Sequence, residues 1–433
     1  MTPRSIAEHT APRTIAEHAA AVLALAGLAR PGTQRLPLFD AAGLHLAADV
    51  PARFAVPPFD NAAMDGFAVH ASDVAGATGD TAAGTPVTLP VAGDIPAGAH
   101  AESCPPGNAV RVMTGAPVPP GSDIVVIPVE QTDIPRGPVP LPAEVTIQDV
   151  QAGRDHIRRA GSNVGVGGIV ARQGALVDAG TLAALVATGV REVKVTARPQ
   201  VAVISTGDEL VPWPGEIQGA QIPNSNLPML AAIARAAGAE VTQLHARDGA
   251  AEFRSLLGSA CAEHNLVVTS GGVSAGAFDV VREVLEGTDA AGSSDGAAWF
   301  GHVAQRPGGP QGLATWRGTP VVCLPGNPVA AFVSAHLYLA PLIRAAAGET
   351  RGLLPHERPR VRASVAPDFP RPKPGTTLLV PVRLDYGETT PRAEALSPLA
   401  PGSHMVATLV GCDGVAVREA SSSMGPEVDV LLI

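Results

Sequence analysis

Carboxylates and glycine-rich turns follow four apolar runs in the middle of the chain. The segment STGDEL at 205–210 follows the first run, and Asp248 follows the second. The third run leads into TSGGVSAG at 269–276 with Asp279 just beyond, and the fourth leads into PGNP at 325–328. Because ligands of open parallel sheets bind beyond the carboxyl ends of the strands, we expect these loops to converge on one crevice.

The residue types in these loops suit an anionic substrate that is handled together with a cation. Backbone N–H groups of the glycine loop, which opens a helix, are placed to cradle a phosphate, although such loops also serve as tight turns. Glu209, Asp248 and Asp279 would face the same crevice. Three carboxylates beside a phosphate repel it unless a cation lies between them, whereas any single one of them is commonly a helix cap.

A second group of polar residues interrupts apolar sequence nearer the N-terminus. The segment PPFDNAAMDGFAV at 57–69 contains Asp60, and AVRVMTGAPVPPG at 109–121 contains Thr114. On pattern alone both segments are typical of turns. These segments therefore allow two interpretations: they form turns without any chemical role, or they contribute residues to a site.

The elements that position the central loops alternate between strand and helix. Apolar runs predict strands at 200–204, 240–244, 266–268 and 321–324. Periodic segments predict helices near 227–237, 250–263, 279–287 and 328–346. This alternation is typical of a doubly wound, mostly parallel sheet with helices on both faces.

Proline-punctuated, β-branched runs on either side predict two further β regions. Runs at 86–91 and 124–129 indicate a small inserted β domain, and the pattern returns after residue 350 as a C-terminal β-barrel-like domain. The fold class is therefore multidomain α/β plus β. We predict four parts: an N-terminal and linker region (1–50 with 151–178), the small β domain (51–150), the α/β domain (179–347) and the C-terminal β domain (348–433).

Composition and charge argue against several classes of protein. A net charge of −10 argues against a nucleic-acid partner, because polyanion binding needs clustered cations. The four cysteines form no CxxC pair, so we expect reduced thiols, no zinc site and a cytoplasmic location. The run at 19–29 predicts a helix rather than a signal peptide, preceded by capping-box patterns at 5–9 and 14–18. No other stretch is long enough to span a bilayer, so direct membrane insertion is not expected.

Taken together, these segments resemble the molybdopterin molybdenumtransferase family, which includes MoeA and the gephyrin E domain. The order matches over nearly the whole chain through PPFDNAAMDGFAV, AVRVMTGAPVPPG, STGDEL, TSGGVSAG, RPGGPQG, LPGNPVAAF and the late Gly402-Ser-His404. The resemblance implies an elongated homodimer. Residues 179–347 would form the molybdopterin-binding α/β domain, and residues 1–50 with 151–178 would contribute to dimerisation. It also implies that molybdate is inserted into adenylyl-molybdopterin with release of AMP, assisted by Mg²⁺.

The site positions of the family carry over onto this sequence residue by residue. The catalytic candidates are Asp60, Thr114, Glu209, Asp248 and Asp279, of which the first two would reach the cleft from the other subunit. Glu209, Asp248 and Asp279 are also the candidates to bind Mg²⁺, which prefers oxygen ligands. The candidates to bind the pterin and its phosphate are Ser205, Gly207, Asp208, Ser270, Gly271, Gly272, Ser274, Arg306, Pro325, Gly326 and Asn327.

The chain departs from the family's pattern mainly on the anion-binding side. The lysine of the usual PGKP is glycine in PGGP at 307–310, which leaves Arg306 as the nearby cation. Loss of one hydrogen bond to a charged group weakens binding by about 1.5 to 3 kcal/mol. An alternative interpretation is therefore a catalytically weakened, gephyrin-like paralogue, a dimeric scaffold that binds the peptide tail of a cell-division or membrane protein. A third, an adenylyltransferase acting alone on the pterin, fits less well because such enzymes resemble only the central domain.

Overall fold

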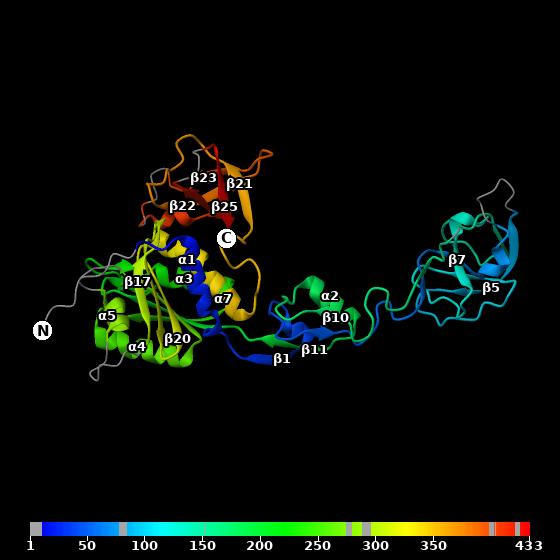
Figure 1. Cartoon of the computed structure of the whole chain (residues 1–433), viewed down its shortest axis with the longest axis horizontal. Coiled ribbons are helices and arrows are strands. Elements are labelled where there is room, and N and C mark those ends of the chain that lie inside the picture. Colours follow the sequence, from blue (N-terminus) through cyan, green and yellow to red (C-terminus); the bar gives the residue numbers. More distant parts are fainter. Residues whose placement is uncertain are drawn as a thin grey trace.

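The chain forms an elongated molecule built from several modules (Figure 1). This computed structural model describes residues 11–77, 85–151, 153–273, 279–287, 296–397, 402, 404–420 and 425–433. The α/β domain and the C-terminal β domain lie together at one end, and the small β domain lies at the other. A connecting module lies between them and contains β1 (Thr33–Pro37), β10 (Ile169–Ala171), α2 (Ala179–Ala187) and β11 (Glu192–Thr196).

A six-stranded mixed sheet forms the centre of the α/β domain. Its order is β15 (Glu240–Ala246), β12 (Gln200–Thr206), β16 (Leu266–Ser270), β20 (Thr319–Leu324), β19 (Pro310–Trp316) and β17 (Ala298–His302). The first four strands are parallel, and the last two pair antiparallel. The chain passes from β12 outward to β15 and then returns to β16, so the winding reverses beside β12. Such a reversal opens a crevice at the carboxyl ends of the strands.

Helices cover both faces of this sheet, as the alternation of the sequence predicts. One face packs against α3 (Asn226–Ala236), α6 (Pro328–Ser334), a π-helical turn (Ala335–Leu339) and α7 (Ala340–Ala347). The other face packs against α4 (Ala250–Glu263) and α5 (Val280–Glu286). Strands that are covered on both faces must be apolar throughout. In β12 this gives the buried run of Val201, Ala202, Val203 and Ile204.

The run Pro328–Ala347 corrects one expectation from the sequence. Among the residues that the structure describes, this run is long and apolar enough to cross a membrane by length and composition, although the sequence analysis excluded such a stretch. In the fold, 78% of its most apolar window is buried. The run comprises α6, the π-helical turn and α7, all packed on the sheet, so its apolar character reflects a position in the protein core.

Packing places two of the predicted domain boundaries elsewhere. Helix α1 (Ile15–Leu23) packs on the core of the α/β domain, although the sequence groups 1–50 with the linker. It begins with the predicted capping box between Thr14 and Glu17, and the similar pattern at 5–9 lies outside the described residues. Conversely, α2 and β11 share an apolar core with β1 in the connecting module rather than with the central sheet. Apolar periodicity identifies an element but does not identify the core on which it packs.

The small β domain is a five-stranded sheet. Its order is β7 (Ile124–Pro128), β4 (Gly66–His70), β6 (Ala109–Val112), β5 (Val87–Ile95) and β8 (Glu144–Ile147). Apolar cores on its two faces take alternate residues of β4, with Ala68 in one core and Phe67 in the other. Gly66 permits close strand pairing, because a Cβ at that position would lie 2.0 Å from the carbonyl oxygen of Ile127. β3 (Asn61–Ala62) pairs with β9 (Ile157–Arg158) where the chain enters and leaves this domain.

The C-terminal domain is a barrel-like sheet. Its strands are β21 (Arg360–Ser364), β22 (Thr377–Asp385), β23 (Arg392–Ala395), β24 (Gly414–Glu419) and β25 (Glu427–Leu432). The pairings run from β22 through β23, β21, β25 and β24, and a direct β22–β24 pairing closes the circuit. The short β18 (Gln305–Arg306) adds to β22 and joins this domain to the α/β domain.

Candidate functional site

A cavity of about 690 Å³ lies at the carboxyl ends of the parallel strands, where the sequence analysis expects the loops to converge. The loops that follow β12, β15, β16 and β20 all contribute to its walls. The predicted site residues that line it are Gly207, Glu209, Asp248, Ser270, Gly271, Gly272, Asp279, Gly326 and Asn327. The structure therefore brings most of the predicted site together, while the roles of the individual residues stay predictions.

The glycines of two of these loops allow an unusually close backbone approach. Gly271 and Gly272 have φ angles of +97° and +66°, a region that side chains rarely adopt. A Cβ at Gly272 would lie 2.7 Å from Cγ2 of Val281 in α5. A Cβ at Gly326 would lie 3.3 Å from Cα of Gly271, in tight contact across the two loops. These approaches leave backbone rather than side chains to form this wall of the cavity.

Two aspartates join the loops that follow β12 and β15. The backbone N–H of Asp208 donates to Oδ2 of Asp248 at 3.2 Å, and the N–H of Asp248 donates to Oδ1 of Asp208 at 3.3 Å. Asp248 lines the cavity, whereas Asp208 does not. Asp208 thus fixes the position of Asp248 instead of facing the ligand space.

The carboxylates do not form a ready-made metal centre. Among the described residues, no three His, Cys, Asp or Glu side chains are close enough together to hold a metal ion. Glu209, Asp248 and Asp279 nevertheless line one cavity. Mg²⁺ is commonly bound by one or two carboxylates together with substrate phosphates and water. This donor set therefore fits a Mg²⁺ ion that arrives with a phosphorylated substrate, and does not fit a structural metal.

Ser205 belongs to a buried network rather than to the wall of the cavity. It is fully buried, and its Oγ lies 3.0 Å from Nδ1 of His245 and accepts from Nδ2 of Asn224 at 2.6 Å. Successive residues of a strand point to opposite faces, so the adjacent Thr206 lines the cavity in its place. The sequence analysis missed Thr206, Asn224 and His245.

Two further residues of the cavity also lie outside the sequence prediction. Asn226 donates through Nδ2 to Oγ of Ser270 at 2.9 Å and to the carbonyl of Gly326 at 2.6 Å, which ties two loops together. His404 lines the cavity from the C-terminal domain. The GSH motif at 402–404 contains this histidine, but only the tertiary fold shows which cavity it faces.

Arg306 and Pro325, like Ser205 and Asp208, are not among the described residues that line the cavity. Arg306 is exposed on β18, where it pairs with Leu378 of the C-terminal domain. Pro325 contributes its carbonyl oxygen, which lies 3.5 Å from Oγ of Ser270, within the supporting structure. Ser274 lies outside the described residues. In the part of the chain that the structure describes, no Lys or Arg lines this cavity.

Asp60 and Thr114 lie in the small β domain, at the far end of the molecule from this cavity (Figure 1). Asp60 directly precedes β3, and its carboxylate accepts from Nη1 of Arg159 at 2.8 Å and from the N–H of Ala160 at 2.7 Å. The Ala160 N–H, and then Arg159, hold the pKa of Asp60 below its usual value. Thr114 follows β6 and donates to Asp65, a residue that the sequence analysis did not select.

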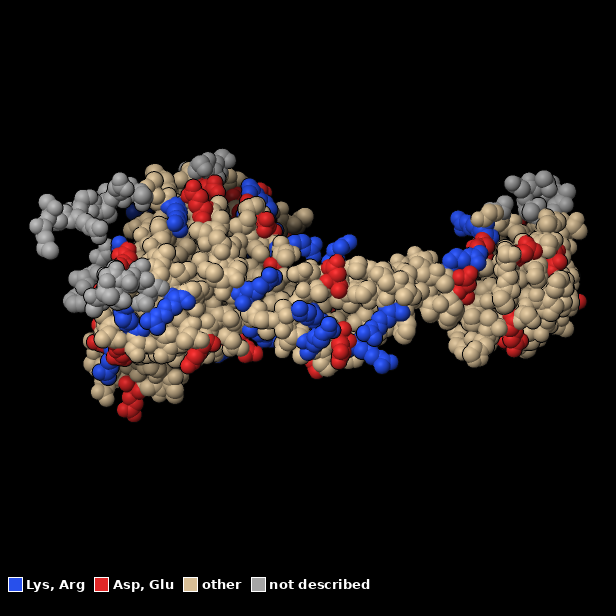
Figure 2. Space-filling view, turned by 60° about the horizontal axis from the view of Figure 1, so that its bottom comes forward, with Lys and Arg blue, Asp and Glu red and all other residues tan. Residues whose placement is uncertain are grey.

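Charged side chains of both signs are interspersed on the face of the molecule shown in Figure 2. Lys and Arg do not gather into one basic patch over the described surface visible in that view. The described surface in this view therefore carries no broad positive field.

Sequence and structure comparisons find similar proteins along nearly the whole chain. Residues 13–189 match the MoeA N-terminal region (domain I and II), and residues 202–345 match a probable molybdopterin binding domain. Molybdopterin molybdenumtransferase 2 of Mycobacterium tuberculosis is 43% identical over 332 residues, which cover 76% of this chain and 79% of that protein. Molybdopterin molybdenumtransferase of Staphylococcus epidermidis is 32% identical over 344 residues, which cover 79% and 77%. A molybdopterin biosynthesis MoeA protein structure from Pyrococcus horikosii aligns with a TM-score of 0.72 and 26% identity, over 98% of this chain and 99% of that one.

Proposed function

Because the chain belongs to the molybdopterin molybdenumtransferase family, we propose that it is a transferase of molybdenum cofactor biosynthesis that inserts molybdate into adenylyl-molybdopterin and releases AMP. The observation that carries this proposal is the 690 Å³ cavity, which combines a glycine loop with three carboxylates. We place the reaction in the cytoplasm, in keeping with the reduced thiols expected from the sequence.

The residues of the cavity divide into two chemical groups. The N–H of Gly271 already donates to the carbonyl oxygen of Leu324 at 3.1 Å. The N–H of Gly272 is left to bind and orient a phosphate oxygen, since exposed backbone N–H groups of such loops favour anions. One or two carboxylates from among Glu209, Asp248 and Asp279 would hold Mg²⁺ together with the phosphates of the substrate. When bound, this ion supplies charge neutralisation for cleavage of the phosphoanhydride. Asn226 and Asp208 then act by keeping the loops in position.

The site requires a second copy of the chain, which we propose forms a homodimer with the first. Asp60 and Thr114 belong to a domain that lies remote from the cavity of its own chain (Figure 1). The connecting module and its junctions expose large apolar side chains, including Phe39 at 74%, Phe54 at 59% and Val166 at 71% exposure. Contiguous exposed apolar patches mark interaction sites, and we propose that these side chains contribute to one. Dimerisation through this module would bring Asp60 to the cavity of the partner chain.

A dimeric scaffold is the second candidate function. It is favoured by one observation, that the described lining of the cavity contains no Lys or Arg to pair with an anionic substrate. In that case the fold would present a peptide-binding surface for the tail of a cell-division or membrane protein, and turnover would be weak. The two candidates differ directly in whether AMP is released.

The test is to incubate the purified full-length protein with adenylyl-molybdopterin, Mg²⁺ and molybdate and to measure AMP. We expect molybdate-dependent AMP release that Asp279→Ala abolishes, with a melting temperature within a few degrees of the wild type. The matched control is Glu283→Ala, which removes a carboxylate from α5 that does not line the cavity. Absence of AMP from a correctly folded wild-type protein would contradict the enzyme and favour the scaffold.

A further inference from the structure

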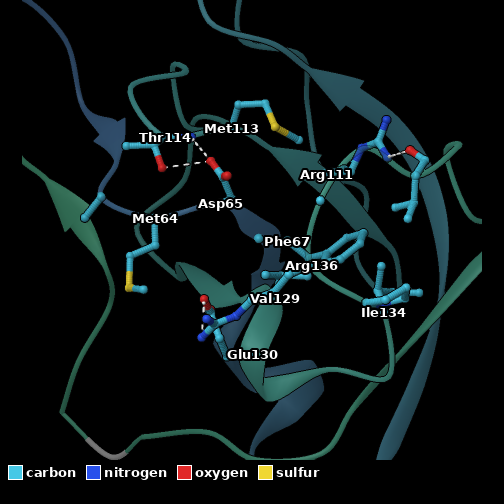
Figure 3. Close-up of a pocket in the computed structure, with 15 residues that line it drawn as sticks. Met64, Asp65, Phe67, Arg111, Met113, Thr114, Val129, Glu130, Ile134 and Arg136 are labelled. Atoms are coloured by element: carbon cyan, nitrogen blue, oxygen red, sulfur yellow. Dashed lines mark hydrogen bonds and ion pairs between the residues drawn. The ribbon is translucent and has the colours of Figure 1, made fainter.

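A second cavity, of about 370 Å³, lies in the small β domain beside Thr114 (Figure 3). Much of its lining is apolar and comes from Met64, Phe67, Met113, Val129 and Ile134. Its volume lies in the range of small-molecule sites. The cavity is separate from the carboxylate-lined cavity of the α/β domain, and no residue that the structure describes lines both.

The hydroxyl group of Thr114 is held at this cavity as a hydrogen-bond acceptor. Thr114 Oγ1 donates to Oδ1 of Asp65 at 2.8 Å, and the N–H of Thr114 donates to the same oxygen at 2.7 Å. These bonds lower the pKa of Asp65, so this carboxylate is ionised at neutral pH and can only accept. Because the single hydroxyl hydrogen is committed to Asp65, Thr114 offers only lone pairs to a ligand.

The two arginines that line the cavity are already engaged. Arg111 donates to both oxygens of Asp94, at 3.0 and 2.6 Å, and to the carbonyls of Val139 and Pro140, at 2.9 and 3.3 Å. Arg136 pairs with Glu130 at 2.9 Å. In the view of Figure 3, these groups lie away from the Asp65–Thr114 pair. The side of the cavity beside Thr114 therefore presents acceptors next to apolar walls, and does not present a cation for a phosphate.

We propose that this cavity binds a planar heteroaromatic ring with an exocyclic amine, whose hydrogens are accepted by Thr114 Oγ1 and Asp65 Oδ2. Among the described groups, none donates to that second oxygen of Asp65. The thioethers of Met64 and Met113 flank the pair in Figure 3 and adapt readily to a flat apolar surface. That this ring belongs to the substrate rests on the proposed function. Adenylyl-molybdopterin contains a pterin and an adenine, and both carry such an amine.

The test is a titration of the full chain labelled with ¹³C in the methionine methyl groups, followed by NMR. The two probe ligands are adenosine and 6-hydroxymethylpterin, and each is compared with an analogue in which oxygen or hydrogen replaces the amine. We expect the signals of Met64 and Met113 to move while that of Met229, in the α/β domain, does not. The analogue that lacks the amine should bind at least about tenfold more weakly. A response to adenosine alone assigns the nucleotide end of the substrate, and a response to the pterin alone assigns the other end.

Two variants identify the groups that accept the amine. Asp65→Asn and Thr114→Val should each raise the Kd of the responding ligand about tenfold. Asp123→Asn is the matched control, because Asp123 accepts from the N–H and Oγ of Ser72 in the same domain but does not line the cavity. The proposal would be overturned if neither ligand moved the signals of Met64 and Met113. It would also be overturned if the analogues without the amine bound equally well, or if Asp65→Asn and Asp123→Asn had equal effects. Because this binding requires no turnover, its failure is distinguishable from failure of AMP release.

Discussion

Replacement of Gly272 by alanine tests how tightly the glycine loop packs against α5. The φ angle of Gly272 is +66°, and a new Cβ would lie 2.7 Å from Cγ2, 2.9 Å from Cβ and 3.2 Å from N of Val281. A left-handed backbone costs a residue with a side chain about 1 to 2 kcal/mol. Forcing one more carbon into a packed site costs about 1 to 3 kcal/mol. We therefore expect Gly272→Ala to lower the free energy of unfolding by about 2 to 5 kcal/mol.

Gly318→Ala is the matched control for this substitution. Gly318 has a φ angle of +90° in the turn between β19 and β20 of the same domain, and a Cβ there would meet nothing within 4 Å. It should therefore show only the backbone cost of about 1 to 2 kcal/mol. Both glycines lie in the α/β domain, so urea unfolding followed by circular dichroism compares the two variants through the unfolding midpoint of that domain. Equal destabilisation of the two variants would refute the close contact between the loop and α5.

Two further predictions concern buried titratable groups. Burial lowers the pKa of His18 to about 3, so the folded protein binds fewer protons than the unfolded chain below pH 6.5. The free energy of unfolding should therefore fall by about 2 kcal/mol between pH 7 and 5. His18→Phe should flatten this pH dependence when both proteins are unfolded in urea. A parallel pH dependence of the wild type and the variant would contradict the prediction. Burial raises the pKa of Cys261 and Cys323 to about 12. Iodoacetamide at pH 8 should modify neither thiol until the protein unfolds, as measured by mass spectrometry of the digested protein.

The position of the main cavity could be predicted because parallel strands end at one edge of a sheet. Glu209, Asp248 and Asp279 follow three different strands, and all three line the cavity. The absence of Ser205 from the described lining has a local cause. Strand β12 continues to Thr206, and a shift of one residue exchanges the side chain that faces the cavity for one that is buried.

Other features depend on contacts between distant segments, which a single sequence does not display. Arg306 lies apart from the cavity lining because β18 pairs with β22 of the next domain. His404 reaches the cavity from the C-terminal domain. Asp65 lies in a motif that reads as a turn, and its importance appears only where Thr114 donates to it twice. Patterns along the chain therefore predicted the elements and strand-end loops better than the supporting contacts.

The claim on which the proposed chemistry depends is that two copies of the chain share each site. The most direct measurement is the AMP release of a co-expressed dimer that carries Asp60→Ala in one chain and Asp279→Ala in the other. Each variant alone should be inactive. In the mixed dimer one site has lost both residues and the other retains both, so random pairing should restore about a quarter of the wild-type rate. A mixed dimer that stays inactive, although the wild-type dimer turns over, would contradict the shared site.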